Sequence, residues 1–284
     1  SEYISKKSGL EEEEMKFKWM KNQKKLEITD SAIDSLQDLV FFPNLETLYV
    51  GNWGSAYPNV SKLTGIENCT KLKELWVING PDKDYTELAY LPNLKIFQRA
   101  LGNDYDNVID ALKLCQNLEQ VVLRGLKMTD MSRISELGNI KILSLQDNDI
   151  SKIEGLENMT NLEKLNLSYN EITSIEGLEN LTKLEILNLQ NNQITDILPV
   201  SVNSSLMELY LKGNSGIDGN KDNYIGEKLE KLNTIGEILD RKGEISIDID
   251  KLGLFTNYRK LDLSGQGLTT LEPLEGMTEL TTLT

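Results

Sequence analysis

The stretch LEKLNLSYNEITSIEGLENLTK, from Leu162 to Lys183, contains the pattern that decides the fold. The same template of apolar residues with one asparagine starts 22 residues earlier, at Ile140, and again 22 residues later, at Leu184. A fixed period of this length is typical of proteins in which each repeat forms one coil of a stack. Carried outward, the frame covers most of the chain and gives these repeat starts: Gln23, Leu45, Leu72, Leu94, Leu118, Ile140, Leu162, Leu184, Leu206, Tyr258 and, for a partial repeat, Leu280.

Each half of the template predicts one part of a coil. In Leu162-x-x-Leu165-x-Leu167, the alternation from the fourth to the sixth residue predicts a short strand with one buried face. The apolar residues that follow, from Ile172 to Leu181, are spaced three apart, which suits a three-ten-like or irregular segment that returns the chain. No coil can bury its apolar edge alone, so neighbouring coils are expected to stack into a solenoid with one continuous core.

Asparagine recurs at the ninth place of four consecutive repeats, where the strand ends and backbone groups lose their sheet partners. A buried amide can both donate and accept hydrogen bonds at such a place. We therefore expect a structural ladder of amides made by Asn148, Asn170, Asn192 and Asn214. Arg99 departs from the template, because it falls where a core leucine belongs.

The composition excludes several classes of function. The chain has 30 basic and 45 acidic residues, a formal net charge of −15, so a nucleic-acid partner is not expected. It has no histidine, which removes conventional catalytic triads and histidine-containing zinc sites. We expect no enzymatic activity and no cofactor. No apolar run approaches the roughly 18 residues of a membrane span, so direct membrane insertion is not expected either.

The two cysteines, Cys69 and Cys115, both occupy the core-facing slot that Met159 and Leu181 fill in other repeats. They lie two coils apart, roughly 10 Å at the usual strand spacing, which is beyond the reach of a disulfide. We predict two buried, free thiols.

Four regions follow from the pattern: a capping helix in residues 1–22, repeats in 23–214, an interruption in 215–257 and resumed repeats in 258–284. Residues Leu10 to Met20 are acidic early and basic late, as a helix dipole favours, and Phe17, Trp19 and Met20 can cover the first coil. In the interruption, residues 221–239 have a helical apolar spacing and residues 244–250 alternate as a strand does.

The motif L-x-x-L-x-L-x-x-N-x-I is intact in residues 162–172 and 184–194, and residues 175–181 read IEGLENL. In these motifs the chain resembles the leucine-rich repeat family, in the 22-residue form of bacterial internalin-type proteins and of an intracellular class of phosphatase-regulatory proteins. The resemblance implies a curved parallel sheet on the concave face, with three-ten or irregular segments on the convex face. It also implies a non-catalytic module that binds a partner on the concave face.

The third, fifth and seventh residues of each repeat point away from the core, so the fold does not require apolar groups there. Several repeats nevertheless carry aromatic, aliphatic or arginine side chains at these places, and a long loop adds Trp53 and Tyr57. We predict a partner-binding patch made by Tyr49, Trp53, Trp76, Ile78, Val122 and Arg124, with a second candidate at Tyr210 and Lys212. The partner is expected to be a protein or a glycan, while a passive spacer would leave this patch unexplained.

A short acidic loop offers one weak metal candidate. Asp218, Asn220 and Asp222 place oxygen ligands at the first, third and fifth positions of a calcium loop. Leu229 stands where the bidentate glutamate belongs, so an ordinary turn is favoured and no metal is expected.

The resemblance is compatible with two cellular locations. An internalin-like protein would be extracellular or on a bacterial cell surface, whereas a phosphatase-regulator type would be cytoplasmic, which suits the free cysteines. The sequence does not define an oligomeric state.

Overall fold

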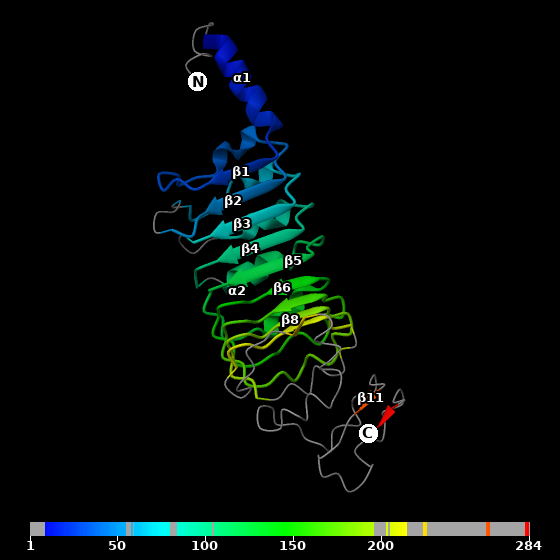
Figure 1. Cartoon of the computed structure of the whole chain (residues 1–284). Coiled ribbons are helices and arrows are strands. Elements are labelled where there is room, and N and C mark those ends of the chain that lie inside the picture. Colours follow the sequence, from blue (N-terminus) through cyan, green and yellow to red (C-terminus); the bar gives the residue numbers. More distant parts are fainter. Residues whose placement is uncertain are drawn as a thin grey trace. The chain divides into compact units, whose positions relative to one another are not determined.

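A computed structural model describes residues 9–54, 58, 60–79, 84–103, 105–195, 203, 205–214, 224–225, 260–261 and 282–283. The chain divides into two compact units, Ser1–Leu126 and Lys127–Thr284. Both units are built from successive coils, each with a short strand (Figure 1).

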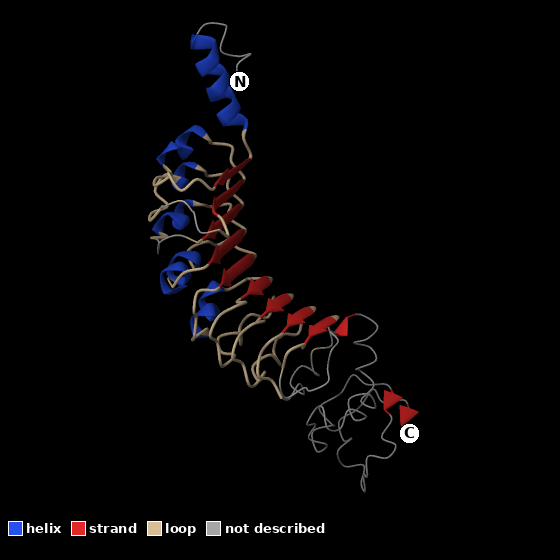
Figure 2. Cartoon of the chain, turned by 60° about the vertical axis from the view of Figure 1, so that its left-hand side comes forward, coloured by secondary structure: helices blue, strands red, loops and turns tan. Residues whose placement is uncertain are grey.

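The N-terminal unit contains five parallel strands in chain order. Its elements are α1 (Gly9–Asn22), β1 (Lys25–Ile28), η1 (Gln37–Phe41), β2 (Thr47–Gly51), η2 (Ile66–Asn68), β3 (Glu74–Ile78), η3 (Thr86–Tyr90), β4 (Ile96–Ala100), α2 (Tyr105–Leu112) and β5 (Gln120–Arg124), where η marks a three-ten helix. The strands line one side of the coils and the helical turns line the other (Figure 2).

The C-terminal unit repeats the arrangement with fewer helical turns. Its elements are η4 (Ser132–Leu137), β6 (Ile142–Ser144), β7 (Lys164–Asn166), β8 (Ile186–Asn188), β9 (Glu208–Tyr210), β10 (Tyr224–Ile225), β11 (Lys260–Leu261) and β12 (Thr282–Leu283). Strands β6 to β9 are parallel neighbours, and β10 pairs antiparallel with β9. Strands β11 and β12 pair in parallel with Lys260 opposite Thr282, a spacing of 22 residues.

The observed register follows the repeat frame. Each of β2 to β9 begins at the third place of its repeat, so residues at equal places lie side by side on adjacent strands within each unit. The sixth places of β3, β4 and β5 hold Val77, Arg99 and Leu123, which pair in that order. Arg99 therefore lies in the core column, fully buried, and its Nη1 donates to the carbonyl oxygens of Ala100 (2.9 Å) and Asn79 (3.3 Å).

The core consists of the template's apolar places, and the fold is a leucine-rich repeat solenoid. The first, fourth and sixth places of the intact repeats are buried, as Leu162, Leu165 and Leu167 are. Cys69 and Cys115 are also buried and free, as predicted. Burial raises the pKa of each thiol to about 11.

The ninth-place asparagines of the C-terminal unit are buried and bond to the backbone of two coils. Asn170 is typical: its Oδ1 accepts from the Ile150 N–H (3.1 Å), and its Nδ2 donates to the carbonyls of Leu145 and Leu167 (both 3.0 Å). Asn192 repeats these contacts one coil later. The full set of buried ninth-place amides is Asn148, Asn170, Asn192 and Asn214.

The N-terminal helix forms a cap on the first coil. The ring of Phe17 lies 5.5 Å from that of Phe41, and the ring of Trp19 meets Phe42 edge-on at 6.5 Å, both measured between centroids. The side chain of Asn44 donates to the Lys21 carbonyl at 2.7 Å, which ties the end of α1 to the end of the first coil. Phe17 and Trp19 remain about half exposed.

Two segments differ from the sequence expectations. The return of the fourth coil is the α-helix α2 rather than a three-ten segment, and it buries Val108, Ile109, Ala111 and Leu112. Tyr224–Ile225 is a strand within the stretch where a helix was predicted. Most of the predicted interruption, including the candidate calcium loop at Asp218, Asn220 and Asp222, lies outside the described residues.

Candidate protein-interaction surface

The open face of the sheet in the N-terminal unit consists of aligned rows. The fifth-place row is Glu27, Tyr49, Trp76, Gln98 and Val122, and the seventh-place row of β2 to β5 is Gly51, Ile78, Ala100 and Arg124. The core side chains alternate with these along each strand, because successive residues of a strand point to opposite faces. Trp76 thus lies between buried Leu75 and Val77 in sequence but on the other side of the sheet.

Tyr49 and Trp76 form the centre of this face. Their ring centroids are 4.9 Å apart at an interplanar angle of 35°, and the Lys25 ammonium lies 4.8 Å from the Tyr49 centroid. The indole Nε1 donates to Glu74 Oε1 at 2.6 Å, and Glu74 Oε2 accepts from the Thr47 hydroxyl at 3.3 Å. Partial burial and the Glu74 carboxylate raise the pKa of Tyr49. Lys25 contacts the Tyr49 ring and Glu74 holds the indole of Trp76, while both residues stay partly exposed.

A cation–π contact connects the C-terminal ends of β2 and β5. The Arg124 guanidinium stacks on the Trp53 ring at 5.1 Å. Trp53 follows β2 and is 53% exposed, whereas Arg124 ends β5. Two asparagine side chains hold the backbone of the Trp53 loop: Asn52 Oδ1 accepts from the Gly54 N–H (2.7 Å) and Asn79 Nδ2 donates to the Gly54 carbonyl (3.2 Å).

The expected exposure of Ile78 was wrong. Its side chain is only 5% exposed, although its place in the strand points it to the open face. In the seventh-place row Ile78 and Ala100 lie between Gly51 and Arg124, and Arg124 at one end of that row stacks on Trp53, which follows the strand at the other end.

One residue of the face was missed by the sequence reasoning. Ile96 at the third place of β4 is half-buried and pairs with Glu74, the residue that holds Trp76. The signal in the sequence was an aliphatic residue at a third place, which points outward as the fifth and seventh places do. We use the name aromatic face for the set Tyr49, Trp53, Trp76, Ile96, Val122 and Arg124; Tyr57 lies outside the described residues.

The second candidate lies on the C-terminal unit and is more polar. The Tyr210 hydroxyl donates to Glu208 Oε2 at 2.7 Å, and this bond raises the pKa of Tyr210. Lys212 is exposed. The neighbouring fifth places hold Asn166 and Asn188, whose side-chain oxygens accept N–H groups two residues later. This surface has no aromatic pair among the residues that the structure describes.

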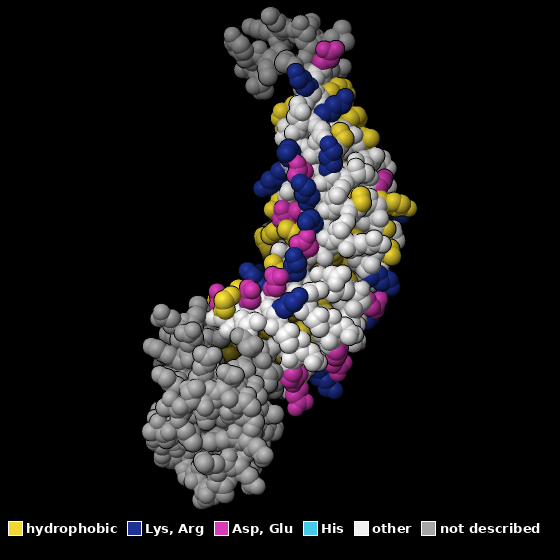
Figure 3. All heavy atoms as spheres, turned by 90° about the vertical axis from the view of Figure 1, so that its right-hand side faces the viewer, with side chains coloured by type: hydrophobic (Ala, Val, Ile, Leu, Met, Phe, Trp, Pro, Cys, Tyr) yellow, Lys and Arg dark blue, Asp and Glu magenta, His cyan; other side chains and the backbone are white. Residues whose placement is uncertain are grey.

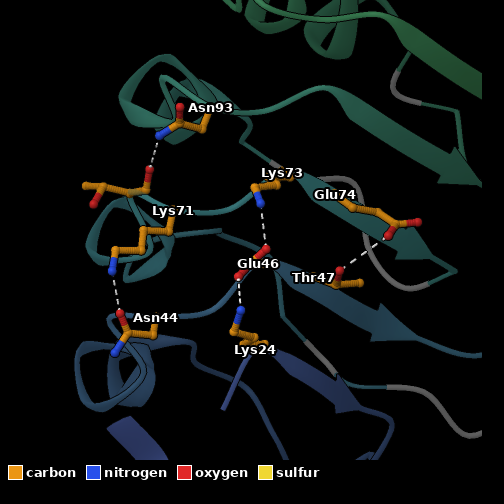
Figure 4. Close-up of polar contacts among 9 residues, drawn as sticks. Lys24, Asn44, Glu46, Thr47, Lys71, Lys73, Glu74 and Asn93 are labelled. Atoms are coloured by element: carbon orange, nitrogen blue, oxygen red, sulfur yellow. Dashed lines mark hydrogen bonds and ion pairs between the residues drawn. The ribbon is translucent and has the colours of Figure 1, made fainter. Parts of the chain in front are cut away.

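Beside the aromatic face runs a row of charged second-place residues. Glu46 bonds Lys24 (2.8 Å) and Lys73 (2.6 Å), and these two ammonium groups lower the pKa of its carboxyl to about 2 (Figure 4). Lys95 and Glu119 form the next pair at 2.6 Å. In Figure 3, acidic and basic side chains are interspersed along this side of the molecule, so neither sign of charge predominates there.

A further row of polar bonds lies one place before each repeat start. Asn93 Nδ2 donates to the Thr70 carbonyl and Asn117 Nδ2 to the Pro92 carbonyl, both at 2.8 Å (Figure 4 shows the first). Each bond joins adjacent coils, whereas the Asn44 bond described above joins the first coil to α1. These exposed amides are structural, and their recurrence before Leu45, Leu94 and Leu118 was visible in the sequence.

Within the described part of the chain, no group of three or more cysteine, aspartate or glutamate side chains is arranged to hold a metal ion. The helices described there are all too short or too polar to cross a membrane.

Comparisons with known proteins support the assigned fold. A family model described as "Leucine Rich repeats (2 copies)" matches residues 138–180 and 160–202. This match agrees with the stacked coils and their register, which have the leucine-rich repeat fold. No curated protein is significantly similar in sequence.

Among solved structures, the chain is similar to internalins. An internalin of Listeria monocytogenes, InlF, is 20% identical with a TM-score of 0.51, and the match covers 94% of this chain and 88% of that one. Internalin C2 of the same organism is 22% identical with a TM-score of 0.55, over 69% and 84% of the two chains. A leucine-rich repeat protein of Leptospira interrogans is 18% identical with a TM-score of 0.56, over 95% and 76%. These likenesses concern the fold.

Proposed function

We propose that this chain is a non-catalytic recognition module that binds a protein through the aromatic face of its N-terminal unit. The observation that carries the proposal is the Tyr49–Trp76 pair, which is stacked, bonded through Glu74 and still partly exposed. Solvent-facing aromatic rings are not needed to build the solenoid, and such rings are enriched among the residues that dominate binding energy.

The geometry suits a binding surface in two further ways. Five strands about 4.8 Å apart give a face about 19 Å wide, enough for the central anchors of a protein interface. The bonds that fix Trp76 and the Trp53 loop reduce the conformational entropy lost on binding, since fewer rotamers need to be ordered. Charged pairs border the face, as polar rims border other interfaces.

We include the cellular location of the protein in the same proposal. Similarity of fold to InlF and internalin C2 favours a secreted or surface-attached bacterial protein. An intracellular regulatory role of the phosphatase-regulator type is the alternative, favoured by two free cysteines. A glycan partner would use the same aromatic rings.

Partner capture with matched variants tests the proposal. The full chain, Trp76→Ala, and the control Tyr90→Ala are immobilised separately, and proteins bound from cell extracts are compared by quantitative mass spectrometry. Tyr90 is the control because it is 65% exposed and lies at the end of η3, away from the sheet. We expect a protein retained by the wild type and by Tyr90→Ala and lost with Trp76→Ala.

Equal retention by all three chains would contradict the proposed surface. Retention of a glycan instead, with the same dependence on Trp76, would keep the surface and replace the class of partner. A chain that acts only as a passive spacer would retain neither a protein nor a glycan.

A further inference from the structure

Gln98, at the fifth place of β4, is a buried polar side chain on the open face of the N-terminal unit. It is only 8% exposed. Among the groups that the structure describes, none forms a hydrogen bond with its side-chain amide. Buried amides are hydrogen-bonded in the great majority of cases, because a polar group without a partner costs stability. Gln98 therefore has a bonding capacity that the solenoid does not use.

The neighbours of Gln98 explain why its amide is not bonded within this face. Trp76 and Val122 lie on either side of it in the fifth-place row. Ile96 and Ala100 precede and follow it on the same face of β4. Three of these four side chains have no polar atom, and the indole N–H of Trp76 is already bonded to a carboxylate at 2.6 Å. The amide is thus surrounded by groups that have nothing to offer it.

The amide is recessed but still reached by solvent. Neither Gln98 Oε1 nor Nε2 is completely buried, so the small exposed fraction of the residue includes its polar end. Its neighbours in the row, Trp76 and Val122, are both more exposed than Gln98. A group that enters between these two side chains from the open side therefore meets the amide.

The chemistry of the amide indicates which group that is. A carboxamide has an acceptor oxygen beside a donor nitrogen, so its complement has a donor and an acceptor side by side. In an extended polypeptide, the N–H and C=O of one residue point to the same side and form such a pair. The apolar surroundings suit aliphatic side chains, whereas sugar hydroxyls placed against Ile96 and Val122 would lose their bonds to water.

We propose that Gln98 determines the specificity of the aromatic face by binding the backbone of an extended segment of the partner protein. Its Nε2 donates to the carbonyl of one residue of that segment, and its Oε1 accepts from the N–H of the same residue. Aliphatic side chains of the segment pack on Trp76 and Val122. The inference rests on the proposed function, because the contact lies on the same face.

Peptides selected on the full chain from a phage-displayed library of random short sequences provide the probe. Those that bind the wild type and not Trp76→Ala are synthesised, and fluorescence anisotropy measures their dissociation constants. Gln98→Met keeps the length of the side chain without its amide, and should weaken binding at least about tenfold. The control Gln116→Met makes the same change at an exposed place after α2 and should bind like the wild type.

Urea denaturation of the free chain separates this role from a structural one. Because the amide of Gln98 forms no bond within the described chain, Gln98→Met should not lower the free energy of unfolding. A loss as large as that of a core variant such as Leu75→Ala would show that the solenoid needs the amide, and would overturn the inference.

An ester scan of the selected peptides tests which backbone group meets Gln98. Replacing one backbone N–H by an ester oxygen removes a donor and weakens the neighbouring acceptor. At the residue that meets Gln98, the ester should weaken binding to the wild type by about fivefold or more. The same ester should have almost no further effect with Gln98→Met, because the contact is already lost.

The outcomes distinguish this inference from the proposed function. Peptides that need Trp76 but bind Gln98→Met as tightly as the wild type would overturn the inference and leave the aromatic face in place, as would an ester scan without a position coupled to Gln98. Chitin oligosaccharides carry the same amide in their N-acetyl groups. If they bind in a Gln98-dependent way and no peptide does, the ligand is a glycan and the inference is wrong. If no ligand depends on Trp76, the proposed function itself fails.

Discussion

At the scale of single residues, the ninth and eighth places of the repeat show how the sequence specifies the turn. Asn170 and Asn192 each serve two coils, because their amides reach the backbone of their own coil and of the preceding one. The residue before each of them, Tyr169 or Asn191, has a positive φ of 57° or 53°, which turns the chain out of the strand. The amide repairs the backbone groups that this turn leaves without sheet partners.

Replacing Asn170 by alanine should therefore reduce the free energy of unfolding. The Ile150 N–H and the carbonyls of Leu145 and Leu167 lose their partner in a buried place, at about 1–3 kcal/mol per group left unsatisfied. Urea denaturation measures the loss. The control is Asn180→Ala, an exposed asparagine nearby, which should change stability by no more than about 0.5 kcal/mol. Equal effects of the two changes would refute the ladder's structural role.

The buried thiols give a pH dependence with a definite sign. Burial raises the pKa of Cys69 and Cys115 from 9.0 to about 11, so the folded chain holds these protons more tightly than the unfolded chain does. Their contribution to stability is complete below pH 9 and is lost as the pH rises from about 9 to about 11. Replacing both by alanine should flatten the stability curve in that range. If the double variant and the wild type lose unfolding free energy equally between pH 9 and pH 11, the folded structure does not raise the pKa of these thiols.

At the scale of elements, a strand in this fold has one side set by the core and one side left free. The sequence predicted the strands and their frame because apolar places recur at fixed intervals, as Leu48 and Leu75 do in β2 and β3. It did not predict that α2 would replace a three-ten turn, since both conformations bury Ile109 and Leu112. Nor did it predict the burial of Ile78, because alternation along a strand gives the direction of a side chain but not whether its neighbours bury it.

Leu75 and Trp76 are adjacent in β3 and point to opposite sides of the sheet, so replacing each of them compares the core side with the open side. Leu75→Ala removes a fully buried side chain and should cost about 2–5 kcal/mol of unfolding free energy. Trp76→Ala removes a partly exposed ring and one hydrogen bond to Glu74, and should cost about 1 kcal/mol. Chemical denaturation of both variants compares them. A loss for Trp76→Ala as large as that for Leu75→Ala would place the indole in the core and remove the basis of the aromatic face.

At the scale of the whole molecule, the repeat specifies the fold but leaves the partner open. The core places recur from coil to coil and the amide ladder recurs in four consecutive coils, so one sequence is enough to predict them. The open face obeys no such rule: Tyr49 and Trp76 are tolerated by the solenoid rather than required by it. Their chemistry indicates a binding surface, while the identity of the partner depends on shape and charge that only the complex would reveal.

Hydroxyl-radical footprinting of the full chain, with and without the captured partner, measures that surface most directly. The account predicts that oxidation of Tyr49, Trp53 and Trp76 falls on binding, while that of the exposed Tyr90 and Tyr169 stays unchanged. Oxidation of Trp76 that is the same in the free and bound chain, with protection at Tyr90 instead, would contradict it.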